Sequence, residues 1–213
     1  MSSNLSGLLR LSSARHDHLC PRQVLGVRMG LAGVAALGWS ERVSKDDGLV
    51  IIETDGCFAD GIEVATGATV GHRTLRVNDL GKIAATFADL GSRAALRFAP
   101  KEQVRIRACE YAQSESGRYF AQLEGYQRMP LEELFQVQEV TLEPSAAALA
   151  SLPTARAICR QCGEEIGNQR EVLVEGAVLC RQCAGAGYYA ITPHAVELDG
   201  VHDDALTQDK ESS

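Results

Sequence analysis

The 213-residue sequence has few aromatic residues, no long apolar run and no excess of basic charge. Aromatic residues make up 5% of the chain while 20 residues are glycine, which predicts an aliphatic core joined by many tight turns. No apolar stretch approaches the roughly 20 residues that a membrane-spanning helix needs. The first 15 residues contain no apolar run and no small-residue cleavage site, so we expect no secretory signal and a cytoplasmic location.

The net charge of −7 is unevenly distributed along the chain. Residues 195–213 hold six acidic residues and one lysine, which leaves about −2 for the first 194 residues. This balance excludes the basic surface of a generic nucleic-acid-binding or anionic-membrane-binding protein. The content of 45% hydrophobic and 23% charged residues is that of a globular protein, followed by an acidic, mobile tail over residues 191–213.

Cysteine, in contrast, is abundant, and four of the seven cysteines form two Cys-x-x-Cys pairs with seventeen residues between them: Cys159 and Cys162, then Cys180 and Cys183. An odd number of cysteines without an export signal argues against a disulfide framework. Each pair places two sulfurs close enough to share a tetrahedral metal, and residues 172–179 between them predict a hairpin. The sequence therefore predicts a zinc ribbon over residues 158–190 that binds one structural zinc ion and folds with it.

The role of this ribbon stays open between a purely structural one and the docking of a protein partner. Residues 158–183 resemble zinc fingers of the DksA/TraR type, which bind RNA polymerase. Acidic residues slightly outnumber arginines there, so the ribbon presents no basic patch for nucleic acid.

The chain before the ribbon predicts an α+β domain with a mixed sheet over residues 1–143, followed by a linker over 144–157. Hydrophobic patterns predict a buried helix over 21–37 and strands over 49–52, 74–77, 83–87, 94–98 and 135–142. Shorter helices are expected over 60–66, 100–111 and 119–129. Gly26, Gly30 and Gly33 lie in the first helix at a cost of about 1 kcal/mol each, which indicates a close-packed neighbour.

Two further cysteines lie where helices are predicted to begin. Cys20 follows His18 by two residues and precedes Pro21, while Cys57 follows the central strand, with Asp60 as the expected N-cap. Free N–H groups and the helix dipole at such positions favour a thiolate and lower its pKa. A thiolate beside an imidazole can serve as a nucleophile, a redox thiol or half of a metal site, and buried structural cysteines are the alternative.

Five motifs of the N-terminal region occur in a fixed order: HLCP at 18–21, GVRM at 26–29, DGCFADGI at 55–62, TGATVG at 66–71 and DLGK at 79–82. Together with the ribbon they resemble the FmdE family, which is named after formylmethanofuran dehydrogenase, over about residues 5–189. The resemblance implies an α+β domain, a homodimer joined through its sheets and a C-terminal zinc-binding domain. This sequence departs from the family pattern at Ala68, where the family has a second cysteine.

The resemblance also implies that His18, Cys20 and Cys57 meet in one pocket, where they bind a second transition metal or act catalytically through a reactive thiol. Asp60 is a candidate fourth ligand, and Lys82 is a candidate partner of an anionic ligand. We therefore expect a dimeric metal-binding protein linked to one-carbon or metal metabolism, with catalysis left open. The alternative is a non-catalytic accessory or regulatory protein whose ribbon docks a protein partner.

Overall fold

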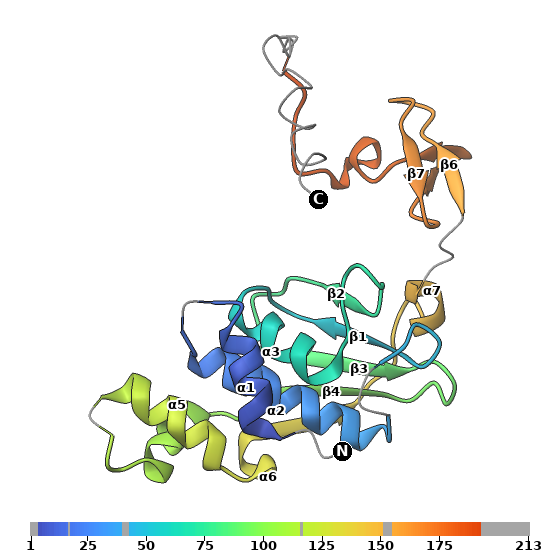
Figure 1. Ribbon diagram of the computed structural model, residues 1–213. Helices are drawn as coiled ribbons and strands as arrows, with labels where there is room; N and C mark the ends of the chain where they lie inside the picture. Colours follow the sequence, from blue (N-terminus) through green and yellow to red (C-terminus); the bar gives the residue numbers. More distant parts are fainter. Residues whose placement is uncertain (1–3, 17, 40–42, 116, 151–154, 193–213) are drawn as a thin grey trace, which may run out of the picture. The chain divides into compact units, whose positions relative to one another are not determined.

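The structure is a computed structural model that describes residues 4–16, 18–39, 43–115, 117–150 and 155–192 (Figure 1). The chain divides into two units, Met1–Ser151 and Leu152–Ser213. The expected α+β class is confirmed, with helices and a mixed sheet in the first unit and a cysteine cluster in the second. In the described ranges, no helix is long and apolar enough to cross a membrane.

The first unit is built on one five-stranded sheet with the strand order β2-β1-β3-β4-β5. Its strands are β1 (Gly48–Ile52), β2 (Leu75–Val77), β3 (Ala85–Asp89), β4 (Ala95–Pro100) and β5 (Phe135–Glu139). β1 and β2 are parallel and the other neighbours are antiparallel. In this register Val50 lies between Leu75 and Phe87, and all three side chains are buried on the same face. That face is the one that the helices cover.

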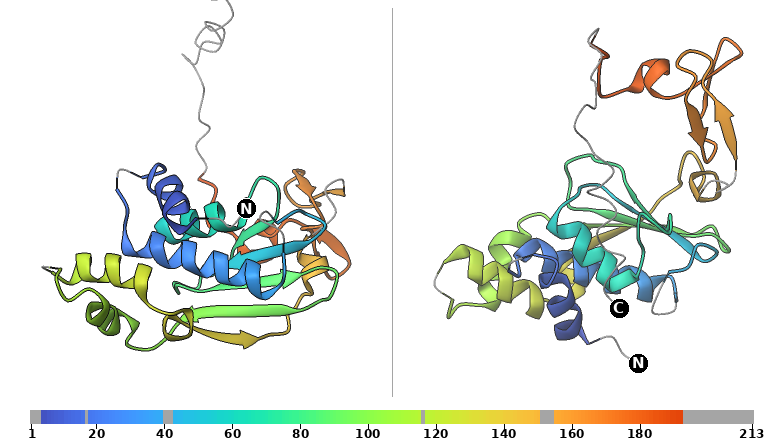
Figure 2. Two further views of the ribbon diagram at one scale, coloured as in Figure 1. Left: turned by 60° about the horizontal axis from the view of Figure 1, so that its bottom comes forward. Right: turned by 45° about the horizontal axis from the view of Figure 1, so that its top comes forward.

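Helices α1 (Leu5–Ser13), α2 (Pro21–Ala36) and α3 (Cys57–Thr66) pack together, and α2 and α3 lie along the sheet (Figure 2, left). Glycines permit a very close approach of α2 to α3. A Cβ atom on Gly26 would lie 2.4 Å from the carbonyl oxygen of Phe58, and one on Gly61 would lie 2.5 Å from that of Gln23. The close-packed neighbour expected for the glycine-rich helix is therefore α3.

The remaining helical elements are α4 (Val104–Arg107), the short turn η1 (Ala108–Tyr111), α5 (Arg118–Arg128) and α6 (Leu131–Leu134). Arg28 on α2 fixes the end of α5 through three hydrogen bonds. Its guanidinium donates to the carbonyls of Tyr126 at 2.7 Å, Gln127 at 2.8 Å and Met129 at 2.8 Å. These carbonyls have no partner within their own helix, so the arginine both satisfies them and attaches α5 to α2.

The opposite face of the sheet carries a buried ion pair. Glu53 directly follows β1 and is only 6% exposed. Arg97 on β4 donates to its two carboxylate oxygens, with Nε at 2.5 Å from Oε1 and Nη2 at 2.8 Å from Oε2. A two-point contact of this kind satisfies a carboxylate that water cannot reach. The hydrogen bonds to Glu53 also raise the pKa of Arg97.

Two expected element starts differ from the structure. The helix expected from Asp60 begins three residues earlier at Cys57, because Gly56 takes a left-handed φ of 70° and turns the chain directly into the helix. Asp60 therefore lies in the first turn and is not the N-cap. The helix expected from Pro100 begins at Val104, because Pro100 still pairs with Phe135 at the end of β4.

The expected linker over 144–157 contains a short helix, α7 (Ala146–Ala150). The hydroxyl of Ser145 accepts a hydrogen bond from the N–H of Ala148 at 3.3 Å, which helps the alanine-rich segment to start a helical turn. Residues 151–154 of this linker, and the acidic tail from residue 193, lie outside the described residues.

The second unit consists of two small hairpins: β6 (Arg156–Ile158) with β7 (Glu165–Gly167), and β8 (Val172–Val174) with β9 (Ala177–Leu179). Glu175 and Gly176 have φ values of 51° and 81°, so the hairpin expected over 172–179 turns where it was predicted to turn. A short helical turn, η2 (Gln182–Ala186), follows. Among the described residues of this unit, only Cys159 and Ile166 are buried. An apolar core of this size is too small to hold the unit folded.

Candidate metal sites

The four ribbon cysteines come together between the two hairpins. Cys159 directly follows β6 and Cys180 directly follows β9, so each hairpin leads into one cysteine pair. The four Sγ atoms all lie within 4.8 Å of one another, and those of Cys162 and Cys180 are 3.9 Å apart. Four sulfurs around a tetrahedral zinc ion at about 2.3 Å are separated by about 3.8 Å. The arrangement therefore fits a closed site for one zinc ion.

Backbone N–H groups are directed at the sulfurs of this cluster. The N–H of Cys180 donates to Sγ of Cys159 at 3.3 Å, and that of Cys183 donates to Sγ of Cys180 at 3.4 Å. Backbone N–H groups, first that of Cys162 and then that of Cys180, lower the pKa of Cys159 to about 6. Burial and the neighbouring thiols raise the pKa of Cys183 to about 12, because further negative charge is unfavourable in the cluster. A divalent cation bound among the sulfurs removes that penalty.

In the first unit, the structure brings Cys20 and Cys57 into contact. Cys20 is the N-cap residue of α2, is 8% exposed, and its N–H donates to Oε1 of Gln23 at 2.7 Å. Cys57 is the first residue of α3 and is half-buried. Because α2 and α3 pack closely, the two thiols are hydrogen-bond neighbours. Two cysteines that are 37 positions apart in sequence thus form one thiol pair.

The pKa of Cys57 is raised, mainly by burial, then by the hydrogen bond and the charge interaction with Cys20 and by the charge of Asp60. The lowered pKa expected from the helix start is therefore wrong for this cysteine. The N–H groups of the first turn do lower it, but burial and neighbouring negative groups have the larger effect. The thiol pair is one that holds protons at neutral pH until a cation replaces them.

Tyr119 on α5 lies beside the thiol pair and was not identified from the sequence. Its hydroxyl donates to the carbonyl of Leu19 at 3.3 Å. Burial, followed by charge interactions with Cys20 and Cys57, raises the pKa of Tyr119. The phenol is thus a neutral polar group next to both sulfurs, held there by the helix that Arg28 attaches to α2.

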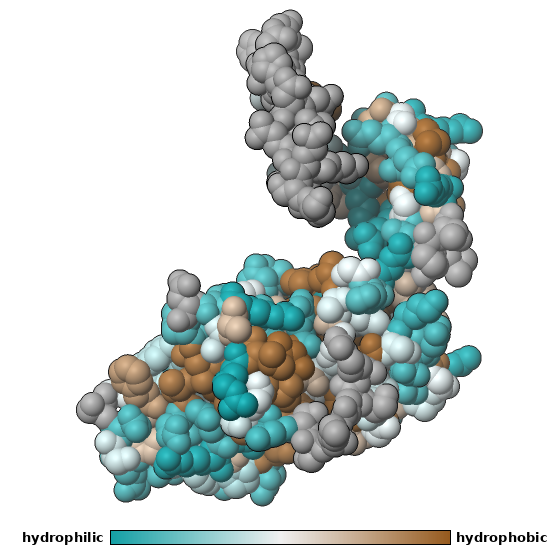
Figure 3. Space-filling view, in the orientation of Figure 1, coloured by the Kyte–Doolittle hydropathy of each residue, from teal (hydrophilic) through white to brown (hydrophobic). Residues whose placement is uncertain are grey.

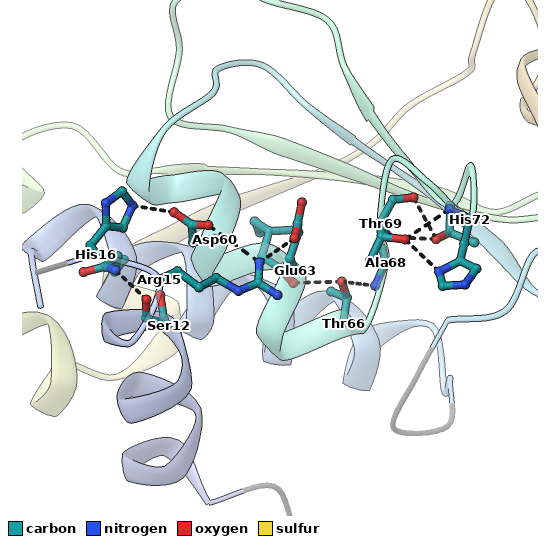
Figure 4. A network of polar contacts seen from close by, with 12 residues as sticks. Ser12, Arg15, His16, Asp60, Glu63, Thr66, Ala68, Thr69 and His72 are labelled. Atoms are coloured by element: carbon teal, nitrogen blue, oxygen red, sulfur yellow. Dashed lines mark hydrogen bonds and ion pairs between the residues drawn. The ribbon is translucent and has the colours of Figure 1, made fainter. Parts of the chain in front are cut away.

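The histidine that contacts α3 is His16 and not the predicted His18 (Figure 4). Nε2 of His16 lies 2.5 Å from Oδ2 of Asp60, and Arg15 approaches Asp60 at 3.6 Å and Glu63 at 2.5 Å. Together these contacts attach the segment after α1 to the first turns of α3. His18 is exposed.

The predicted trio of His18, Cys20 and Cys57 is not assembled as a three-ligand group. Throughout the described ranges, the ribbon cysteines are the one group of three or more His, Cys, Asp or Glu side chains whose ligand atoms lie within 4.8 Å of one another. Lys82, the candidate partner of an anion, is exposed, and its backbone N–H donates to the carbonyl of Glu53 at 3.1 Å.

The glycine-containing loop after α3 is a structural turn, as its sequence favours. Gly67 ends the helix in the left-handed conformation, and Oγ1 of Thr66 accepts the N–H of Ala68 at 3.1 Å. His72, expected to lack a clear partner, contacts Oγ1 of Thr69 through Nδ1 at 2.8 Å (Figure 4). Ala68 is fully buried where the family pattern has a cysteine.

Comparison with known proteins agrees with the division into two units. Residues 15–136 match the family described as FmdE, Molybdenum formylmethanofuran dehydrogenase operon, and residues 153–189 match the prokaryotic dksA/traR C4-type zinc finger. A probable S-adenosyl-L-methionine-binding protein of Archaeoglobus fulgidus is 30% identical over 93% of this chain, which spans 58% of that protein. A solved FmdE-like protein of Syntrophus aciditrophicus, described as of the tungsten formylmethanofuran dehydrogenase, shares the fold, with a TM-score of 0.55, 21% identity and coverage of 89% and 96% of the two chains.

Proposed function

The chain belongs to the FmdE family, and from this premise we propose that its first unit binds an exchangeable transition-metal ion through Cys20 and Cys57. The ribbon holds a separate, structural zinc ion. The protein thus acts as a metal-binding protein with one closed site and one open site. The single observation that carries the proposal is the contact between the two thiols at the starts of α2 and α3.

The chemistry of the thiol pair favours a zinc-like ion. Two thiolates are soft ligands, which select late first-row ions over magnesium or calcium. They supply half of a tetrahedral set, and an incomplete set leaves positions for water, substrate or an exchanging ligand. His18 follows from the same motif as Cys20, and Asp60 lies one helical turn after Cys57, so both are candidates for the remaining positions.

Removal of the two thiols should lower the metal content by one ion per chain. In a Cys20→Ser/Cys57→Ala variant, the serine keeps a side chain that can cap α2, while neither residue remains a soft ligand. We expect the wild-type protein, loaded with zinc anaerobically, to hold about two ions, of which a mild chelator removes one, and the variant to hold about one. Plasma emission spectroscopy after gel filtration measures this.

The matched control is Cys109→Ala, which removes a half-buried cysteine that belongs to neither site. This control should keep both ions. If the wild-type protein holds one tightly bound zinc only, or if the double variant still holds two, the thiol pair is not a metal site.

One observation favours the accessory function as a second candidate. The ribbon exposes large apolar side chains: Ile158 is 59% exposed, Leu173 71% and Tyr188 96%. Such residues on a small metal-stabilised unit fit a docking role toward a protein partner. A protein with one tightly held zinc and no second site would favour this candidate over the first.

The link to one-carbon or metal metabolism is a further part of the proposal, and the family name supports it. The binding of S-adenosyl-L-methionine named for the Archaeoglobus fulgidus relative is not carried over, because this chain spans 58% of that protein.

We also propose that the chain forms a homodimer. β5 is an edge strand of the sheet, and Val137 on it is 50% exposed. Apolar residues also gather over α1–α3 on the face shown in Figure 3. Sedimentation equilibrium should give twice the chain mass of 22.9 kDa at micromolar concentration. A single species of 22.9 kDa under those conditions contradicts the dimer.

A further inference from the structure

A hollow of about 430 Å³ opens on the first unit between the ends of β4, α4 and α5. None of the ribbon cysteines and neither cysteine of the thiol pair lines it. Ten residues do: Leu25, Ile83, Pro100, Lys101, Gln103, Val104, Arg105, Ile106, Arg118 and Tyr126. This volume lies within the range of small-molecule sites in proteins.

The floor of this hollow is apolar and firmly packed. Leu25 is 6% exposed, Val104 5% and Tyr126 1%, so each is fixed in the core beneath the hollow. Ile106 forms part of the rim and is 65% exposed. A large aliphatic side chain left this open beside a hollow provides a surface on which an apolar group would be shielded from water.

Three cations surround this floor: Lys101, Arg105 and Arg118 are all exposed. No carboxylate is among the lining residues, and in the described part of the chain none of the three forms an ion pair. Arg107 and Arg128 on the same helical elements, in contrast, pair with Glu133 and Glu124.

The positive charge extends to the floor. Burial raises the pKa of Tyr126 to about 12, and the charge of Arg105 acts in the opposite direction. In a chain of net charge −7, three unpaired cations around one hollow are a local feature and not a result of overall composition. They repel one another, and a bound anion would relieve that repulsion.

We propose that this hollow binds a small amphipathic anion, with a carboxylate or phosphate group held by Lys101, Arg105 and Arg118 and an aliphatic or aromatic body on the apolar floor. Arginine provides forked donors that match such groups. An anion without an apolar body would leave the floor unused, and an apolar molecule without charge would leave the cations unpaired. The proposal does not depend on the thiol pair.

The test uses the full-length protein and isothermal titration calorimetry with octyl phosphate below its micelle concentration. We expect one binding event per chain. Two partial ligands separate the contributions: inorganic phosphate has the charge without the tail, and octyltrimethylammonium has the tail with the opposite charge. Each should bind at least about tenfold more weakly than octyl phosphate, because each satisfies only half of the site.

An Arg105→Gln/Arg118→Gln variant should weaken octyl phosphate binding at least about tenfold, since both changed groups are charged hydrogen-bond donors. Both residues are exposed, so the fold is expected to persist, and a circular dichroism melt checks it. Ile106→Ser tests the apolar rim separately and should also weaken binding. The matched control, Arg160→Gln/Arg170→Gln, makes the same change of charge in the ribbon and should leave binding unchanged.

Sedimentation with vesicles distinguishes a free anion from a lipid headgroup. Binding of octyl phosphate without retention on phosphatidylcholine vesicles containing one third phosphatidylglycerol supports a soluble ligand. Retention on these vesicles that is lost in the Arg105→Gln/Arg118→Gln variant would overturn that source in favour of a membrane surface. Absence of octyl phosphate binding, as when a protein partner or a second copy covers the hollow, or equal binding of octyltrimethylammonium, would overturn the proposal.

Discussion

Replacement of Cys162 by serine is expected to release about one zinc ion per chain and to unfold the ribbon. Two observations give the reason. The four sulfurs form a closed set with no spare ligand, and Cys159 and Ile166 are the only buried residues among the described part of this unit. Zinc binding by such peptides supplies on the order of 10 kcal/mol at neutral pH, so the folding free energy of the unit is the metal-binding free energy.

Zinc content and limited trypsin digestion measure the two effects of Cys162→Ser. Arg156 lies in β6 and is paired with Glu165, so the bond after it should become cleavable only when the ribbon unfolds. Cys109→Ser serves as the control, because it removes a cysteine of the first unit. Melting of the first unit should be unchanged, because its core lies within Met1–Ser151. Full zinc content in Cys162→Ser would contradict a closed four-cysteine site.

The ribbon was predictable because its information is local in sequence. Two Cys-x-x-Cys pairs and a Glu175-Gly176 turn specify both the ligand set and the hairpin between the pairs, whatever the rest of the chain does. The close helix neighbour was predictable in kind, since three glycines in one helix are costly unless something packs against them. That this neighbour is α3 required the structure.

The thiol site was predictable only in part, because its contacts join distant parts of the chain. The positions of Cys20 and Cys57 at helix starts follow from local patterns, and their contact does not. Tyr119 is 62 positions after Cys57, and nothing near it in sequence indicates a site. The choice between His16 and His18 depends on where the chain after α1 meets Asp60, a contact across 44 positions.

The direction of the Cys57 pKa shift shows the same limit. The local argument counts the N–H groups and the dipole of the helix start, which do favour a thiolate. Burial and the neighbouring Cys20 and Asp60, which follow from tertiary packing, act in the opposite direction and have the larger effect. Local patterns therefore located the cysteines correctly and gave the wrong sign for the acidity of Cys57.

Replacement of Gly26 by alanine is expected to destabilise the first unit and, with it, to disturb the thiol pair. A Cβ atom there would lie 2.4 Å from the carbonyl oxygen of Phe58 and 3.0 Å from Cα of Gly61. Both atoms belong to the backbone of α3, so no side-chain rotation relieves the overlap and α2 and α3 must separate. Because Cys20 and Cys57 begin these two helices, their separation also pulls the two sulfurs apart.

Alanine in a helix interior gains about 1 kcal/mol over glycine, whereas overpacking costs about 1–3 kcal/mol and more where the backbone must move. We expect the overlap to exceed the gain, so that Gly26→Ala lowers the free energy of unfolding by about 2 kcal/mol in urea titrations. Gly7→Ala in α1 is the matched control, since its Cβ would meet no atom closer than 3.9 Å, and it should leave the free energy unchanged or raise it. Gly26→Ala should also lose the exchangeable metal while keeping the zinc of the ribbon, because the two sites lie in separate units. Equal or greater stability of Gly26→Ala would contradict the close contact of α2 and α3 on which the position of the thiol pair depends.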